Sequence, residues 1–272
     1  MREGCHRLRD DERRMWREDG FFVRPAVFPE LELEALRAGA ERVARAAERV
    51  ARAGRSYEVD GNRYVDVGET TLQYEHRSGS QTLRVVEPFH HLDPLFGELL
   101  DDLRIVEPIC DLVGAERAAL WTDKLNFKRP LEGSGFRWHQ DSPYWAHACA
   151  HLDLLPNVML ALDAADPENG CLRLVRGSHR RGLLPGCQGE GVLGPLFTDP
   201  RHFDLAAAVP AVMPAGSLLF FSAHTVHGSE PNRSTRARRA CVLTYQPPGH
   251  PMFKRSGCRE SAPVGARREA IG

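Results

Sequence analysis

The segment with the clearest chemical potential is Phe136-Arg-Trp-His-Gln-Asp-Ser-Pro-Tyr-Trp145, in which His139 and Asp141 stand two residues apart. On an extended chain, side chains at positions i and i+2 point to the same side, so this imidazole and this carboxylate can reach one metal ion. A lone His-x-Asp pair is weak evidence, because a capping aspartate beside a surface histidine has the same spacing. A metal site therefore requires a further ligand elsewhere in the chain.

Candidate third ligands follow the apolar run 217–222, where Ala-His-Thr-Val-His-Gly-Ser places His224 and His227 just after a predicted strand. Two histidines and one carboxylate on one face of an ion form the facial triad typical of non-haem Fe(II) oxygenases, which leaves positions open for a cosubstrate and O₂. Zinc accepts similar ligands. The residues alone therefore leave open both the metal and the choice between these two histidines.

A basic residue shortly after these histidines could bind an anion. Arg238 begins the run 238–245, whose apolar residues occupy both faces of an alternating strand. An arginine that points inward from a buried strand needs an anion, because an unpaired buried charge is costly, and its guanidinium matches a carboxylate in bidentate fashion. A dicarboxylate cosubstrate could chelate iron at one end and meet Arg238 at the other. The alternative is a surface arginine in an Arg-rich loop.

Together these motifs resemble the phytanoyl-CoA dioxygenase (PhyH) family over about residues 10–246. The matching segments are His139-Gln-Asp141, His227-Gly-Ser-Glu-Pro-Asn-Arg-Ser234 with Arg238 eleven residues after His227, Asn169–His179 and Asp19–Val23. The resemblance implies an Fe(II)/2-oxoglutarate-dependent dioxygenase on a double-stranded β-helix, or jelly roll. Such an enzyme uses 2-oxoglutarate and O₂ as cosubstrates, hydroxylates an aliphatic C–H of a small metabolite, and releases succinate and CO₂.

The resemblance also implies roles for single residues. It selects His227 rather than His224 as the third iron ligand, beside His139 and Asp141. Related halogenases replace the aspartate by a small residue that makes room for chloride, so its presence here predicts hydroxylation or another oxidation. The distal carboxylate of 2-oxoglutarate would be held by two further residues, Arg238 and Ser229.

Several other residues near the motifs are candidates for contacts with cosubstrate or substrate. Strand alternation places Lys124, Asn126 and Lys128 on one face, where a lysine could hold an anionic group; a solvated strand face is the alternative. Asn126 resembles a polar cosubstrate-binding residue of some relatives, and we group Lys124 with it. Lys128, Tyr144 and Trp145 are the substrate candidates, with core or rim aromatics as the alternative for the last two.

Two other classes of protein remain as rivals at this point. One is a cupin-like metal-dependent hydrolase or isomerase, which would use zinc and no 2-oxoglutarate. The other is a non-catalytic jelly-roll binding module that has lost its metal. Activity without 2-oxoglutarate would favour the first rival, and failure to bind Fe(II) would favour the second.

The elements that must position these residues are helices early in the chain and strands later. Apolar residues at three- and four-residue steps predict a helix from Pro29 to about residue 53, and Asp93-Pro94 predicts the start of a helix that runs to about Val113. The remaining predicted elements are a short helix at 10–19, a strand at 21–23, extended pieces over 57–86 with a hairpin turn at Asp60-Gly61, and strands at 118–128, 136–139, 157–162, 171–175, 217–222 and 239–246. This order predicts a mainly β fold with flanking helices.

The chain of 272 residues is expected to form a single jelly-roll domain over 1–246, with an N-terminal helical part at about 10–113 and a flexible tail at 247–272. The long connection over 180–214 and the segment around Tyr57–Ser80 are alternative candidates for a lid. A formal net charge of -1 argues against a generally basic nucleic-acid or membrane-surface protein. Seven cysteines without a CxxC pair predict reduced thiols rather than a disulfide framework. With no secretory signal recognised, a cytoplasmic enzyme of small molecules is expected.

Overall fold

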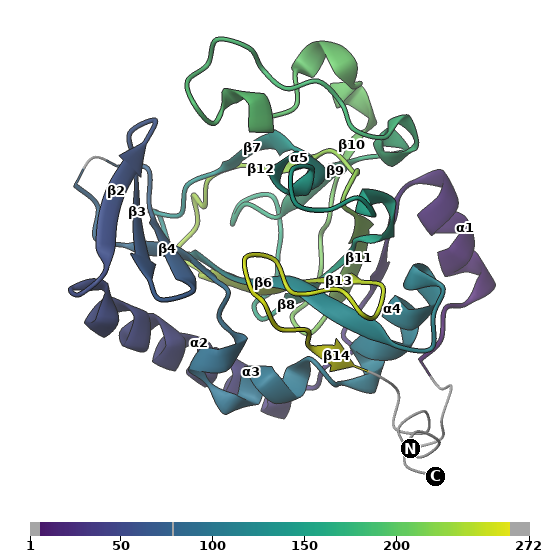
Figure 1. Cartoon of the computed structure of the whole chain (residues 1–272), viewed down its shortest axis with the longest axis horizontal. Helices are drawn as coiled ribbons and strands as arrows, with labels where there is room; N and C mark the ends of the chain where they lie inside the picture. The colour runs from purple at the N-terminus through teal and green to yellow at the C-terminus, as the bar shows by residue number, and fades with distance from the viewer. Residues whose placement is uncertain (1–5, 78, 262–272) are drawn as a thin grey trace.

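The computed structural model describes residues 6–77 and 79–261, and within them two antiparallel sheets face each other (Figure 1). The helices are α1 (Asp10–Glu18), α2 (Glu30–Ala51), α3 (Pro94–Leu99), α4 (Leu103–Val113) and α5 (Ser142–Trp145). The strands are β1 (Phe21–Arg24), β2 (Arg55–Val59), β3 (Asn62–Val67), β4 (Thr70–Tyr74), β5 (Leu83–Glu87), β6 (Ala118–Lys128), β7 (Phe136–His139), β8 (Pro156–Ala161), β9 (Leu172–Val175), β10 (Ala208–Pro210), β11 (Leu218–Ser222), β12 (His227–Ser229), β13 (Arg238–Gln246) and β14 (Glu260–Ser261). The prediction of a mainly β chain with flanking helices is confirmed.

Strand order explains how distant motifs meet. Among the described residues, the larger sheet has the order β1-β11-β8-β13-β6-β5-β4-β3-β2, with β14 paired to β6, and the smaller sheet has the order β10-β9-β12-β7. The two strands that carry the histidine motifs, β7 and β12, are therefore neighbours in the smaller sheet. The strand that begins with Arg238, β13, lies opposite them in the larger sheet.

The outer face of the larger sheet is covered by helices, as Figure 1 shows for α2 and α3. The predicted apolar stripe of α2, which includes Leu33, Leu36 and Val43, is buried in one core cluster with outward-facing strand residues such as Leu125 and Phe127. Burial of a leucine or phenylalanine side chain contributes roughly 1.5–3 kcal/mol. This packing holds the sheet in place and leaves its inner face for the site.

The predicted helix over 94–113 is wrong in one respect, because the structure divides it into α3 and α4. The break falls at residues 100–102, where the side chain of Asp102 accepts a hydrogen bond from the Arg104 N–H at 2.9 Å. An aspartate in this position satisfies one of the unpaired amides that begin a helix and thereby favours a new start. Asp93 caps α3 in the same way through the Leu95 N–H, as the Asp-Pro signal predicts.

The predicted strand boundaries hold within a residue or two for β6, β7, β8, β9, β11 and β13. Two strands in the smaller sheet, β10 and β12, are absent from the prediction. Each has three residues, which is too short for alternation to be distinguished from a loop. The turn at Asp60-Gly61 forms the predicted hairpin between β2 and β3.

The C-terminal segment corrects the expectation of a flexible tail from residue 247. Glu260 and Ser261 form β14 against β6, Met252 is buried, and the Phe253 ring lies 5.2 Å from that of Trp121. The part of the expectation that concerns 262–272 lies outside the described residues.

Two smaller expectations concern thiols and membranes. Six cysteines within the described residues are unpaired, five of them buried, as expected for reduced thiols, and Cys5 lies outside those residues. Among the described helices, none has the length and apolar character needed to cross a bilayer.

Candidate metal centre

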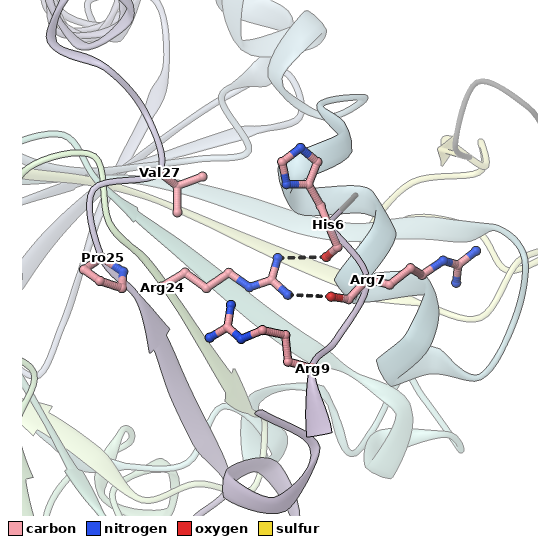
Figure 2. A pocket seen from close by; sticks show the side chains of 6 residues that line it. All are labelled: His6, Arg7, Arg9, Arg24, Pro25 and Val27. Carbon is pink, nitrogen blue, oxygen red and sulfur yellow. Dashed lines mark hydrogen bonds between the residues drawn. The ribbon is translucent and has the colours of Figure 1, made fainter. Parts of the chain in front are cut away.

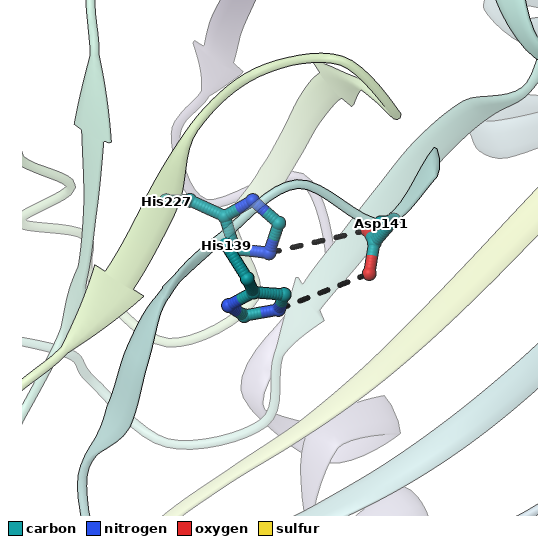
Figure 3. A group of neighbouring side chains, drawn as sticks. All are labelled: His139, Asp141 and His227. Carbon is teal, nitrogen blue, oxygen red and sulfur yellow. Dashed lines mark ion pairs between the residues drawn. The ribbon is translucent and has the colours of Figure 1, made fainter. Parts of the chain in front are cut away.

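The three predicted metal ligands converge in space (Figure 3). His139 ends β7 and His227 begins β12, and the two residues are direct partners across the antiparallel pair. Their ring centroids lie 4.2 Å apart. Asp141 follows β7 by two residues, and one ligand atom from each of the three side chains lies within 4.8 Å of the others. Within the described part of the chain, this is the one group of three or more potential ligands with that geometry.

Both histidines are oriented by a backbone carbonyl two residues upstream. His139 Nδ1 lies 2.7 Å from the carbonyl oxygen of Arg137, and His227 Nδ1 lies 2.9 Å from that of Thr225. An N–H donated at Nδ1 leaves the Nε2 lone pair free, and the two Nε2 atoms lie 4.0 Å and 3.9 Å from the carboxylate oxygens of Asp141. Metal-bound histidines are typically fixed in this manner. The donor set therefore fits a divalent ion with two imidazoles and one carboxylate.

Burial sets the protonation states that a metal requires. Burial, with the neighbouring His227 ring adding to it, lowers the pKa of His139 to about 3, so this imidazole is neutral at physiological pH. Burial opposes ionisation of Asp141, but Lys124 and the two histidines outweigh it and lower the pKa of this carboxyl group. Metal binding consequently needs no proton to be displaced from either group.

Asp141 is held by a chain of polar residues that sequence reasoning missed. Asn157 Nδ2 donates to Asp141 Oδ2 at 2.9 Å, and Thr244 Oγ1 donates to Asn157 Oδ1 at 2.6 Å. The available signal was an asparagine in the otherwise apolar strand β8. Gln140 adds to this support, because its amide bridges the carbonyl oxygens of Gly182 and His224.

His224 lies outside the group of ligands. Its Nε2 lies 2.9 Å from Asp153 Oδ1, and its backbone N–H bonds to Ser222. The turn that separates it from His227 directs the two rings to different neighbours. Of the two histidines left open by the motif, the structure brings His227 to the candidate metal centre.

A second cluster, at the start of β13, combines two buried cations. Arg238 is 3% exposed, its Nη2 donates to the Gly170 carbonyl at 2.8 Å, and its Nε has no hydrogen-bond partner. Lys128 is 1% exposed and its Nζ donates to Ser229 Oγ at 2.8 Å. No carboxylate forms an ion pair with either cation among residues 6–77 and 79–261. Since unpaired buried cations are costly, this cluster favours an anionic ligand.

Burial and neighbouring positive charge also shift the pKa values of these two cations. Burial lowers the pKa of Arg238 to about 10. Burial, together with Arg238 and Arg84, lowers the pKa of Lys128 to about 6. An anion placed between them would restore the charged form of the lysine.

One face of β6 runs from the metal ligands to the pair of buried cations, Arg238 and Lys128. Lys124 Nζ lies 3.7 Å from Asp141 Oδ1, at the metal end, while Lys128 lies at the Arg238 end. Asn126 lies between them, opposite Ala240 on β13. Its side chain forms no hydrogen bond with protein in the described part of the chain. A dicarboxylate could thus run along this face from the metal to Arg238.

The structure places the two aromatic candidates differently. The Tyr144 ring makes an edge contact with His139 at 5.9 Å and is half-buried, so it borders the metal centre. Trp145 is 1% exposed and packs edge-on against Trp121 at 6.2 Å, with Lys124 Nζ 5.3 Å from its ring. The buried Trp145 ring therefore packs against the Lys124 side chain.

Comparisons with known proteins agree with this geometry. The family model described as phytanoyl-CoA dioxygenase (PhyH) matches residues 16–240. Methylphosphonate hydroxylase of Gimesia maris is 30% identical over 244 residues, which cover 88% of this chain and 80% of the relative. Ectoine dioxygenase of Bordetella parapertussis is 28% identical over 264 residues, which cover 88% of this chain and 75% of the relative.

Solved structures confirm the jelly-roll fold. EctD from S. alaskensis with 2-oxoglutarate and 5-hydroxyectoine superposes with a TM-score of 0.67 at 19% identity, covering 93% of this chain and 80% of that one. The 2-oxoglutarate-dependent carbocyclase SnoK from nogalamycin biosynthesis gives 0.65 at 20% identity, covering 97% and 91%. At this identity the likeness concerns the fold alone.

Proposed function

Because the chain belongs to the phytanoyl-CoA dioxygenase family, and is a non-haem iron, 2-oxoglutarate-dependent dioxygenase of small metabolites, we propose that His139, Asp141 and His227 are its iron ligands. The observation that carries this assignment is the convergence of the three ligand atoms within 4.8 Å. Family membership sets aside the metal hydrolase or isomerase and the non-catalytic binding module. The metal is Fe(II), and 2-oxoglutarate and O₂ are the cosubstrates.

The residues at the Arg238 end would hold the distal carboxylate of 2-oxoglutarate. Arg238, with its unpartnered Nε, and Ser229 are the predicted contacts, and the position of Lys128 beside Ser229 adds it to this group rather than to the substrate. Asn126 and Lys124 would contact the cosubstrate nearer the iron. This arrangement gives a charge-assisted anchor for one carboxylate deep in the barrel.

Bound iron and O₂ would supply the oxidation: one oxygen atom of O₂ enters succinate as 2-oxoglutarate loses CO₂, and the other enters a substrate C–H bond. The chain's own residues orient the reactants. The backbone carbonyls behind His139 and His227 fix the two rings, Asn157 fixes the carboxylate of Asp141, and the two buried cations set the direction of 2-oxoglutarate. Tyr144 borders the metal and would form part of the substrate wall.

The substrate is proposed to be a small polar metabolite. Methylphosphonate and ectoine, which name two relatives, are both small molecules with an anionic group. We assign the activity to one domain that spans 1–246, to which the packed segment 247–261 also contributes. We further place this enzyme in the cytoplasm, acting on neither nucleic acid nor membranes, in line with its balanced charge.

The experiment that tests this function measures succinate formed from 2-oxoglutarate by the Fe(II)-loaded protein against a library of small polar metabolites. A substrate is expected to raise succinate release above the slow uncoupled level and to yield a product heavier by one oxygen. Succinate release that does not depend on Fe(II), or that is unchanged in His139→Ala, would contradict the proposal.

A further inference from the structure

One surface hollow is lined by three arginines, and each of them already has an acidic partner. It encloses about 260 Å³ and is lined by His6, Arg7, Arg9, Arg24, Pro25 and Val27 (Figure 2). Arg24 pairs with Glu12 at 2.7 Å, Arg7 pairs with Asp111 at 2.7 Å, and Arg9 also pairs with Glu12. Its arginines are therefore engaged in holding the start of the chain to α1 and α4. Arg84, which is buried inside the barrel, forms no ion pair with any described residue.

Arg84 points into the barrel because β5 contains a bulge. On β4, Gln73 pairs with Val85 and Tyr74 pairs with Leu83, so Arg84 is the extra residue between two consecutive pairs. Leu83 belongs to the outer core beneath the helices. The bulge breaks the strict alternation and re-aims the side chain, as bulges near active sites commonly do. Arg84 is 5% exposed.

The guanidinium of Arg84 crosses from the larger sheet to the smaller one. Its central carbon lies 3.8 Å from the centroid of the Phe136 ring, and its Nη2 donates to the Gly135 carbonyl at 2.7 Å. Its Nη1 contacts the imidazole of His76. Its Nε is buried and has no hydrogen-bond partner.

No carboxylate compensates this charge by direct contact. In the described part of the chain, Arg84 forms no ion pair, and Glu75 acts on it only at longer range. The buried Glu75 carboxylate accepts the Ser134 N–H at 2.8 Å through Oε2, while its Oε1 has no hydrogen-bond partner. Burial accordingly lowers the pKa of Arg84. A guanidinium buried in this way is expected to have an anionic partner.

Arg84 lies 3.8 Å from the centroid of the Phe136 ring, where Lys128 Nζ also lies, at 5.8 Å. It comes from β5, on the opposite side of β6 from the strand that carries Arg238, so the two arginines approach the barrel from different edges. The hydroxyl groups of Tyr144 and Tyr64 are among the groups that influence its charge. Tyr144 in turn borders His139.

We propose that Arg84, with the Tyr144 hydroxyl, binds an anionic group of the substrate, a phosphonate or a carboxylate, and so holds the substrate beside the metal centre. This inference rests on the proposed function, since it concerns the same site. The distal carboxylate of 2-oxoglutarate already has its own partners in Arg238, Lys128 and Ser229. An anionic substrate would supply a negative charge in direct contact with the Arg84 guanidinium, which no carboxylate of the described residues does.

The test uses the full chain loaded with Fe(II) and saturating 2-oxoglutarate without O₂, so that the Arg238 cluster is occupied. Methylphosphonate, acetate and neutral acetamide are titrated separately, and binding is followed by the visible absorption of the iron-bound 2-oxoglutarate and by the melting temperature. Methylphosphonate and acetate distinguish a phosphonate from a carboxylate. The variants are Arg84→Met and Arg84→Lys, with Arg63→Met as a matched control, since Arg63 stacks on Tyr74 on the neighbouring strand.

The wild-type protein is expected to bind at least one of the two anions and to ignore acetamide. Arg84→Met should weaken that binding at least tenfold, Arg84→Lys should weaken it less, and Arg63→Met should leave it unchanged. The affinity for 2-oxoglutarate should not fall in any of the three variants, because Arg84 lowers the pKa of Lys128 and its loss favours the ammonium that meets the cosubstrate. Equal anion binding in wild type and Arg84→Met, or no anion binding by the wild type, would overturn the inference.

Two further outcomes separate this inference from the proposed function. If Arg84→Met weakens 2-oxoglutarate binding and leaves binding of the small anions intact, then Arg84 serves the cosubstrate and the inference is wrong. If the wild-type protein forms no absorption band with Fe(II) and 2-oxoglutarate, the proposed function itself fails. A normal band in Arg84→Met together with the loss of anion binding supports both.

Discussion

Two histidines three residues apart, His224 and His227, are placed in different environments, and this gives a matched pair of variants. His227 faces Asp141 and its partner His139, whereas His224 bonds to Asp153. His227→Ala should reduce Fe(II) affinity by more than about 100-fold, because loss of an outer-shell partner alone commonly costs 10–100-fold. His224→Ala should keep Fe(II) binding within about tenfold. Equilibrium dialysis with Fe(II) under anaerobic conditions measures both, and equal losses would contradict the assignment.

We expect Lys128 to make the binding of 2-oxoglutarate depend on pH. Its pKa of about 6 in the free protein leaves the amine mostly neutral at pH 8. A carboxylate placed beside it favours the ammonium and raises that pKa, so binding should take up close to one proton at pH 8. The affinity is therefore full below pH 6 and falls as the pH rises above 6, by up to about tenfold per unit, until the pH passes the pKa of the bound state.

Calorimetry in two buffers with different ionisation enthalpies, using the Fe(II)-loaded protein without O₂, measures this proton uptake. Lys128→Met should abolish it and flatten the pH dependence. Binding of 2-oxoglutarate by the wild-type protein at pH 8 with no proton uptake would show that Lys128 does not meet the carboxylate.

At the scale of elements, the β2–β3 hairpin is joined to the long connection that borders the smaller sheet (Figure 1). The Asp60 carboxylate, at the hairpin tip, accepts the backbone N–H groups of Val192 and Leu193 at 3.0 Å and 2.7 Å. Asp60→Ala removes both charge-assisted hydrogen bonds. Amide hydrogen exchange over 190–197 should then accelerate by about tenfold or more.

Glu58→Ala is the matched control for this prediction, since Glu58 is an exposed acidic residue on the same hairpin. It should leave exchange in 190–197 unchanged. Similar exchange in Asp60→Ala and wild type would mean that the hairpin does not restrain this connection.

Elements also show where sequence reasoning succeeds and where it stops. The His-x-Asp spacing and the strand position of Arg238 are local patterns that left alternatives open, and the family resemblance selected His139, Asp141 and Arg238 without coordinates. The inward direction of Arg84 depends on the register between β4 and β5, which alternation within one strand does not contain. Likewise, the break between α3 and α4 depends on a single capping residue, Asp102, inside a continuous apolar pattern.

At the scale of the whole molecule, we expect the packed segment 247–261 to contribute to the free energy of unfolding. It buries Met252, stacks Phe253 near Trp121 and adds β14 to the larger sheet. A chain that ends at residue 246 loses these contacts and should be less stable by at least about 3 kcal/mol, since burial of one large apolar side chain contributes 1.5–3 kcal/mol. The melting temperature should fall by roughly 5–10 °C.

Ser256→Ala, a change at an exposed position of the same segment, serves as the control and should melt within about 2 °C of the wild-type chain. Scanning calorimetry measures both. An unchanged melting temperature after truncation at 246 would mean that the segment adds nothing to the core. The expectation of a flexible tail came from its Gly, Pro and Arg content, which does not report contacts made by Met252 and Phe253.

In the proposed function, three side chains from β7, the turn after it and β12 bind one ferrous ion, and 2-oxoglutarate chelates that ion. Anaerobic addition of 2-oxoglutarate to the Fe(II)-loaded protein tests it most directly by visible absorption spectroscopy. We expect a weak charge-transfer band in the wild-type protein and in His224→Ala, and no band in His139→Ala or His227→Ala. A band that persists without His139, or that never forms in the wild-type protein, would contradict it.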